Sequence, residues 1–173
     1  MQNGLQEDKE MPAHMGHRPS ATKCLHDLRG AVAAWVLGFL QTDDLPQLAA
    51  TALGEGLDNA ALRQLSGVTS ADIDVGNELL RRGLEESGWS VPDERTAAVQ
   101  YAVCVSRLIL SEDLTPYQGA RAIWQASLSV GDRSFHDLDP FIYAAAEWEE
   151  RPQDRRHFEQ AVVEEARTWA ERN

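Results

Sequence analysis

The sequence predicts an all-α fold, a compact single-domain bundle of about seven to eight short helices. Apolar residues recur at helical spacing in segment after segment, whereas the alternation typical of strands is almost absent. The segments are joined by short loops that carry helix-capping residues and prolines. A chain of 173 residues buries roughly 70% of the surface that its unfolded form exposes, which is enough for one core.

The chain divides into a leader, residues 1–20, and a helical domain, residues 21–173. The leader is polar and lacks an apolar segment flanked by basic residues, so we expect it to be disordered and not a secretory signal. The longest apolar run, from Ala31 to Leu40, has ten residues, about half of what a bilayer span requires. We therefore expect a cytoplasmic protein without contact with a membrane.

The first predicted helix starts after Ser20 or Thr22 and is the central helix of the bundle. Its apolar stripe continues through the longest apolar run, so we expect it to be buried on nearly all sides. The residues of this stripe are Leu25, Leu28, Val32, Trp35 and Phe39, widened by Val36 and Leu40.

Two further helices are marked by turn residues at their ends. The second begins at Asp43 or Asp44, has Pro46 in its first turn and stops at the sequence GEG. The third is short, runs over residues 58–65 and is closed by Gly67.

The fourth and fifth predicted helices follow. The fourth opens with a capping pattern from Thr69 to Asp72. Gly76 and Gly83 lie on its apolar face, where a missing side chain lets another helix approach closely. Asp93 caps the fifth helix, which ends near Ser111; its apolar face consists of Ala98, Tyr101, Ala102, Val105, Leu108 and Ile109.

The last three helices complete the bundle. The sixth has the clearest start, with Thr115 at the N-cap, Pro116 at the first helical position and Gln118 completing a capping box. The seventh begins at Asp139, which precedes a proline, and runs until Pro152. The eighth has an apolar stripe of Phe158, Val162, Ala166 and Trp169.

The charge balance restricts the class of partner. The chain has 28 Asp and Glu against 16 Lys and Arg, a formal net charge of −12. A surface this negative repels a phosphate backbone, because nucleic-acid binding relies on Lys and Arg. It favours a basic partner. The scarcity of lysine relative to arginine and the abundance of alanine indicate a bacterial protein from a high-GC genome.

The segment from Leu62 to Leu84 has the outline of a helix-turn-helix and supports an alternative function, a DNA-binding regulator. Gly67 fits the turn. The motif requires a small residue four positions earlier, where the two helices touch, and this chain has Arg63 there. The second helix also presents carboxylates where a DNA reader needs donors. These carboxylates belong to Asp72, Asp74 and Glu78.

Catalytic and metal-binding motifs are absent from the sequence, so we expect no cofactor and no metal, and a protein that is not an enzyme. Cys24 and His26 lie about 200° apart around a helix and cannot hold one ion together. Cys24 and Cys104 are typical of small buried side chains in a reducing compartment. A second alternative is an enzyme or small-molecule binder with a site inside the helical core, lined by residues such as His26, Arg107 or Tyr143.

One loop and one corner are candidate partner-binding sites. In the loop, Arg133, His136 and Asp137 surround Phe135, which we expect to be exposed. Polar residues beside an aromatic ring on a loop are typical of a binding edge, although turn chemistry and helix capping use the same residues.

The corner joins the last two helices. Glu147, Glu149 and Glu150 lie at the end of one helix, beside Trp148, and three arginines surround the start of the next. Both placements oppose the helix dipoles. The alternative is that the opposite charges pair across the turn, which contributes at most about 1 kcal/mol at an exposed site. The arginines are Arg151, Arg155 and Arg156.

These observations favour an acidic protein-interaction module, of the immunity or inhibitor type, that binds a basic protein partner. Electrostatic steering is the physical reason for the analogy, because acidic immunity proteins neutralise basic nuclease toxins in this way. The DNA-binding regulator and the core-site binder remain as alternatives, and the sequence does not define the oligomeric state.

Overall fold

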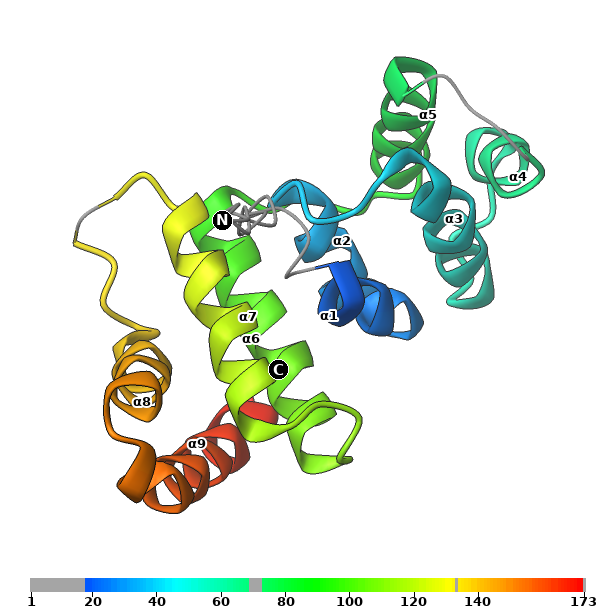
Figure 1. Ribbon diagram of the computed structural model, residues 1–173. Coiled ribbons are helices and arrows are strands. Elements are labelled where there is room, and N and C mark those ends of the chain that lie inside the picture. Colours follow the sequence, from blue (N-terminus) through cyan, green and yellow to red (C-terminus); the bar gives the residue numbers. More distant parts are fainter. Residues whose placement is uncertain (1–17, 69–72, 133, 173) are drawn as a thin grey trace, which may run out of the picture.

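The computed structural model describes residues 18–68, 73–132 and 134–172, and in this part of the chain it is all-α, as predicted. Figure 1 shows the arrangement of its nine α-helices. The helices are α1 (Arg18–Lys23), α2 (Leu28–Val36), α3 (Leu45–Gly54), α4 (Ala60–Ser66), α5 (Ile73–Glu86), α6 (Glu94–Leu110), α7 (Pro116–Ser129), α8 (Asp139–Glu150) and α9 (Arg155–Ala170). Three short 3-10 helices are η2 (Cys24–His26), η3 (Thr42–Asp44) and η4 (Pro152–Asp154).

The helix count exceeds the predicted seven to eight because the first predicted helix is two helices. α1 begins at Arg18, inside the segment assigned to the leader, and the chain leaves helical geometry at Asp27. Asp27 has extended backbone angles, and its side chain accepts hydrogen bonds from the backbone N–H groups of Arg29 and Gly30. An aspartate in this conformation starts a new helix. α2 then ends at Val36 instead of continuing to Leu40.

Most other predicted boundaries match the structure. α3 has Pro46 in its first turn, Asp93 caps α6, and Thr115 forms the expected capping box at the start of α7. α4 is capped by Asn59, one residue after the predicted start, because the Asn59 side chain accepts from the N–H of Leu62. The predicted capping pattern at the start of α5, residues 69–72, lies outside the described residues.

The seventh predicted helix, α8, begins at Asp139 as predicted but has no side-chain cap. Leu138 occupies the N-cap position, and Asp139 is already the first helical residue. The Asp139 carboxylate lies 3.0 Å from Nδ1 of His136 instead of capping the backbone.

Buried apolar residues form two clusters that meet at α2. Ala33 and Ala34 belong to the cluster built by α6–α9, whereas Leu28, Ala31 and Val32 belong to the cluster built with α3–α5. One short helix therefore contributes opposite faces to both clusters, which agrees with its predicted role as the buried central helix. In Figure 1, α3–α5 form a lobe at one end of the molecule, and α8 and α9 lie at the other.

Three glycines allow close contacts between helices. A Cβ atom on Gly30 of α2 would lie 2.5 Å from Cβ of Cys104 in α6. A Cβ atom on Gly83 of α5 would lie 2.6 Å from Cγ of Leu62 in α4, which confirms the close approach predicted for Gly83. A Cβ atom on Gly119 of α7 would lie 2.4 Å from Cδ1 of Ile109 in α6. No helix in the described part of the chain is long and apolar enough to span a membrane.

Candidate functional site

The predicted loop site is a structured turn, and its aromatic residue is buried. Phe135 has 7% of its surface exposed, so the expectation of an exposed ring is wrong. The guanidinium of Arg95, from α6, lies 5.2 Å from the centre of the ring. Asp132 begins the turn by accepting a hydrogen bond of 2.8 Å from the N–H of Ser134. Arg133 lies outside the described residues.

Ion pairs of Arg95 connect this loop to α6. Arg95 pairs with Asp137 at 3.1 Å and with Asp132 at 3.6 Å. His136 and Asp139 contact each other at 3.0 Å. The described polar residues of the loop therefore act in turn formation and in loop attachment, the roles that the sequence offered as the alternative to a binding edge.

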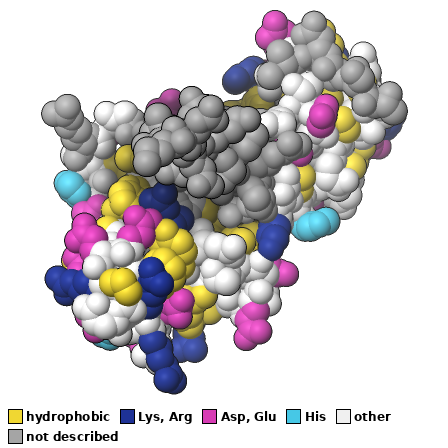
Figure 2. All heavy atoms as spheres, viewed as in Figure 1, with side chains coloured by type: hydrophobic (Ala, Val, Ile, Leu, Met, Phe, Trp, Pro, Cys, Tyr) yellow, Lys and Arg dark blue, Asp and Glu magenta, His cyan; other side chains and the backbone are white. Residues whose placement is uncertain are grey.

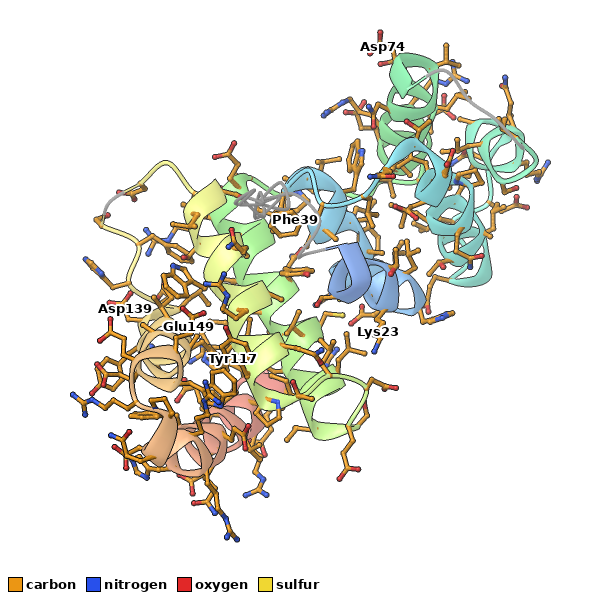
Figure 3. All side chains as sticks on the ribbon, in the orientation of Figure 1. Lys23, Phe39, Asp74, Tyr117, Asp139 and Glu149 are labelled. Atoms are coloured by element: carbon orange, nitrogen blue, oxygen red, sulfur yellow. The ribbon has the colours of Figure 1, made fainter. Side chains whose placement is uncertain are left out.

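At the corner between α8 and α9, two of the three glutamates have internal partners. Glu147 is 2.8 Å from Nε of Arg151 across the turn, and only 16% of its side chain is exposed. Glu149 accepts a hydrogen bond of 2.5 Å from the Tyr117 hydroxyl group of α7 and lies 3.5 Å from Arg121. Figure 3 shows the Tyr117 and Glu149 side chains close together between α7 and α8. Charge pairing at this corner extends to a third helix.

Trp148 completes the corner as a packed residue. Its ring stacks on Tyr117 with 3.8 Å between centroids, and Arg155 lies 4.0 Å from its centre. Its indole N–H donates to Glu159 of α9 at 3.2 Å. These contacts connect α7, α8 and α9, so the ring is half-buried and not presented to a partner.

The predicted loop and corner lie at opposite ends of α8. Asp137 precedes the helix and Glu150 ends it. A rise of 1.5 Å per residue separates the two sites by about 18 Å along the helix. Three helical turns therefore separate the loop from the corner. Glu150 is exposed, and among the described residues it has no ion-pair partner.

The α4–α5 pair packs differently from the helix-turn-helix outline in the sequence. Arg63 projects into solvent and forms a two-pronged ion pair with Asp58, its Nε lying 2.6 Å from the carboxylate. Close packing occurs at Gly83, and the Asn59 side chain donates to the Gly83 carbonyl at 2.6 Å. The contact between these helices therefore lies near the end of α5.

The lobe formed by α3–α5 is strongly acidic. Between residues 42 and 86, the described residues include eight carboxylates and three arginines, a net charge of −5. All three arginines have partners: Arg63 pairs with Asp58, Arg82 with Glu86 at 3.6 Å, and Arg81 lies 5.4 Å from the centre of the Trp35 ring. The lobe thus retains excess negative charge.

Exposed carboxylates form a stripe along α5. Glu78 and Glu85 are exposed, and in the part of the chain that the structure describes neither has an ion-pair partner. They are separated by two helical turns and so share a side of the helix. Asp74 lies one turn before Glu78, at the outer tip of α5 in Figure 3, and Val75 beside it is 53% exposed. We call Asp74, Glu78 and Glu85 the acidic stripe.

The opposite sign of charge gathers in a cleft that the sequence did not predict as a unit. Arg29 beside the start of α2, Arg107 of α6 and Arg172 after α9 line a cleft of about 330 Å³. An adjoining cleft is lined by His26 together with Arg29 and Arg107. Two residues proposed to line a core site, His26 and Arg107, therefore line one cleft together, and this cleft opens to the surface. The third, Tyr143, is exposed at 59% and lies at neither cleft.

The two cysteines are buried, as predicted, and lie beside each other. A hydrogen bond with Cys104, followed by burial, raises the pKa of the Cys24 thiol well above its ordinary value. In the described ranges, no group of three or more His, Cys, Asp or Glu side chains is arranged to hold a metal ion.

On the face presented in Figure 2, carboxylates occur at the outer end of the α3–α5 lobe, and acidic and basic side chains are interspersed at the opposite end of the molecule. No family model, curated protein or solved structure matches the chain. The assignment of a function therefore depends on the geometry and charge of the surface.

Proposed function

We propose that the protein is an acidic interaction module that binds a basic protein partner through the outer face of α5. The observation that carries this proposal is the acidic stripe, in which Glu78 and Glu85 lack ion-pair partners among the described residues. The nearby Arg81 contacts the Trp35 ring and Arg82 pairs with Glu86, and among the described residues neither forms an ion pair with Glu78 or Glu85.

Physical chemistry supports a basic partner for such a surface. Complementary charge accelerates encounter and determines orientation, and the effect decreases as salt screens it. Val75, exposed beside the stripe, offers apolar area that a docked partner would remove from water. This combination of a charged surface and a smaller apolar contact is suited to the neutralisation of a basic protein, as immunity and inhibitor proteins do.

The α8–α9 corner is less suited to the same task. Glu147, Glu149 and Trp148 already hold neighbouring helices together. Releasing them to contact a partner would leave half-buried groups without their present contacts, which costs free energy. Among the described glutamates of this corner, Glu150 alone is free of such a role.

The test is capture of partners from a native bacterial lysate on the immobilised protein, followed by mass spectrometry. Capture is compared at about 0.05 M and about 0.5 M salt, because screening strengthens over this range. The stripe variant Glu78→Lys/Glu85→Lys is compared with Glu150→Lys/Glu164→Lys, which changes the net charge equally at exposed sites on the other lobe.

We expect one defined basic protein, captured less at high salt and reduced about tenfold or more by the stripe variant, in line with the loss of close charge pairs. The matched control variant should reduce capture much less. Failure to capture a basic protein, capture indifferent to salt, or equal loss in the two variants would overturn the proposal. Recovery of DNA with the protein would instead favour the regulator hypothesis.

A further inference from the structure

A cleft lies where the start of α2, one face of α6 and the end of α9 meet. Val99 and Val103 of α6 provide apolar walls, and Gln100 provides an amide group. Its volume of about 330 Å³ falls at the lower end of the range typical of small-molecule sites. A ligand with an apolar body of modest size fits this space.

The charge of the cleft is opposite to that of the whole protein. Arg29, Arg107 and Arg172 line it, and Asp27 is the one carboxylate among the described lining residues. The cleft therefore has a net charge of +2 in a chain with a net charge of −12. Three arginines gathered from three separate segments create a local preference for an anion.

The three guanidinium groups differ in their availability. Arg107 is 3.3 Å from the Asp27 carboxylate and donates to the backbone carbonyl of Ala170 at 3.4 Å, so it holds helices together. Arg29 has no side-chain partner among the described residues. Arg172 stacks on the Trp169 ring at 3.9 Å, a contact that leaves the N–H groups on its edge available.

We propose that this cleft binds a small organic anion, an apolar body that carries one phosphate or carboxylate group. Arginine presents planar pairs of N–H donors that match the oxygens of these two groups. Arg29 and Arg172 supply the donors, Arg107 adds fixed positive charge, and the valines contact the apolar body. The site is separate from the acidic stripe, and the proposal does not depend on the proposed protein partner.

The test is an NMR titration of the full chain with phenyl phosphate, followed through backbone amide signals. Saturable shifts are expected at Val99, Gln100 and Val103, with a dissociation constant of about 1 mM or below. Benzyl alcohol has a similar ring without charge and should give no saturable shift. Inorganic phosphate should bind more weakly than phenyl phosphate, because it lacks the apolar body.

Variants of the cleft should change affinity in opposite directions. Arg29→Gln and Arg172→Gln should each weaken phenyl phosphate binding about tenfold, the loss of one charge-assisted contact. Asp27→Asn should tighten it, because the substitution removes the opposing charge and keeps a residue able to cap α2. Arg167→Gln removes an exposed arginine of α9 that does not line this cleft and should leave affinity unchanged.

Arg29 has no side-chain contact to lose, so its variant tests the proposal even if Arg172→Gln loosens the end of α9. Absence of saturable shifts, equal response to benzyl alcohol, or unchanged affinity in the folded Arg29→Gln variant would overturn the proposal. Binding of inorganic phosphate as tightly as phenyl phosphate would contradict the assignment of an apolar body.

Discussion

Tyr101 is fully buried, and its hydroxyl group has no hydrogen-bond partner among the described residues. The ring makes an edge contact with Phe39, at 5.3 Å between centroids. An unsatisfied buried hydroxyl costs roughly 1–3 kcal/mol. The hydroxyl therefore lowers stability, and the thiols of Cys24 and Cys104 act on it electrostatically.

The variant Tyr101→Phe should raise the free energy of unfolding by about 1 kcal/mol at neutral pH, because it removes the unsatisfied group. It should also change the alkaline pH profile. Burial, with smaller contributions from both thiols, raises the pKa of Tyr101 well above its ordinary value of 10.0. The unfolded chain then loses its proton at a lower pH than the native state, so stability decreases as pH rises through the unfolded pKa.

Urea unfolding between pH 7 and pH 11 measures both effects. In the natural protein, stability should decrease first above the ordinary thiol pKa of 9.0, because the Cys24 pKa is also raised, and more steeply above 10. Tyr101→Phe should retain the first decrease and lessen the second. A variant that is less stable at pH 7, or that has an unchanged slope above pH 10, would show that the hydroxyl is satisfied.

Glu149 and Glu150 are adjacent glutamates with different surroundings. Glu149→Lys should lower stability by about 0.5–1 kcal/mol, a value that allows for its partial exposure. The reason is loss of the Tyr117 hydrogen bond and repulsion from Arg121. Thermal melts should show a decrease in Tm of a few degrees for a chain of this size. Glu150→Lys should leave Tm almost unchanged, and equal effects of the two substitutions would contradict the contacts described at this corner.

Asp27 connects two elements at the scale of the helices. One carboxylate oxygen caps α2, and the other pairs with Arg107 of α6. Asp27→Ala should lower stability by about 1–2 kcal/mol, because it removes a cap and an ion pair. Asp27→Asn should lower it much less, because asparagine caps equally well. Chemical denaturation of both variants measures the difference, and equal losses would assign the whole effect to the ion pair.

Gly119 permits the close approach of α6 and α7. A Cβ atom there would lie 2.4 Å from both Cδ1 and Cγ1 of Ile109. Gly119→Ala should therefore lower stability by about 1–3 kcal/mol, the usual effect of overpacking. The control is Gly54→Ala at the end of α3, where the added Cβ meets nothing within 4 Å and alanine favours the helix. Denaturation curves in which both variants are more stable than the natural protein would show that the Ile109 side chain can move to accommodate the added methyl group.

Local signals in the sequence predicted the elements well where a cap is self-contained. Asp93 and Thr115 each bond to an N–H three residues later, so a short window of sequence holds the whole interaction. The break at Asp27 was missed because the apolar period continues across it. The burial of Phe135 is not visible in the local sequence, because the Arg95 side chain that packs on it comes from α6.

At the scale of the whole molecule, local sequence signals do not predict sites that are assembled from distant segments. Arg29, Arg107 and Arg172 are far apart in the chain and follow no motif spacing, so the cleft that they share exists only in the fold. The acidic stripe was recognisable in part, since Asp74 and Glu78 stood out as carboxylates on the fourth predicted helix. The contact of Arg81 with Trp35 was not recognisable, because Trp35 belongs to another helix, whereas Arg82 and Glu86 are four residues apart within α5.

The two apolar clusters predict that the lobes differ in local stability. Leu62 is fully buried in the cluster of α3–α5, and Leu138 is fully buried in the cluster of α6–α9. Replacing either by alanine should lower stability by about 2–5 kcal/mol. Each cluster consists mainly of residues from its own set of helices. The loss of stability should therefore be greatest in the lobe that contains the substitution.

Native-state hydrogen exchange on the two variants measures this difference. Leu62→Ala should increase exchange in α3–α5 more than in α7–α9, and Leu138→Ala should do the reverse. Amides of α2 should respond to both substitutions, because Val32 and Ala33 of this helix belong to different clusters. If both variants instead increase exchange uniformly in every helix, α2 couples the clusters so strongly that the protein opens as one cooperative unit.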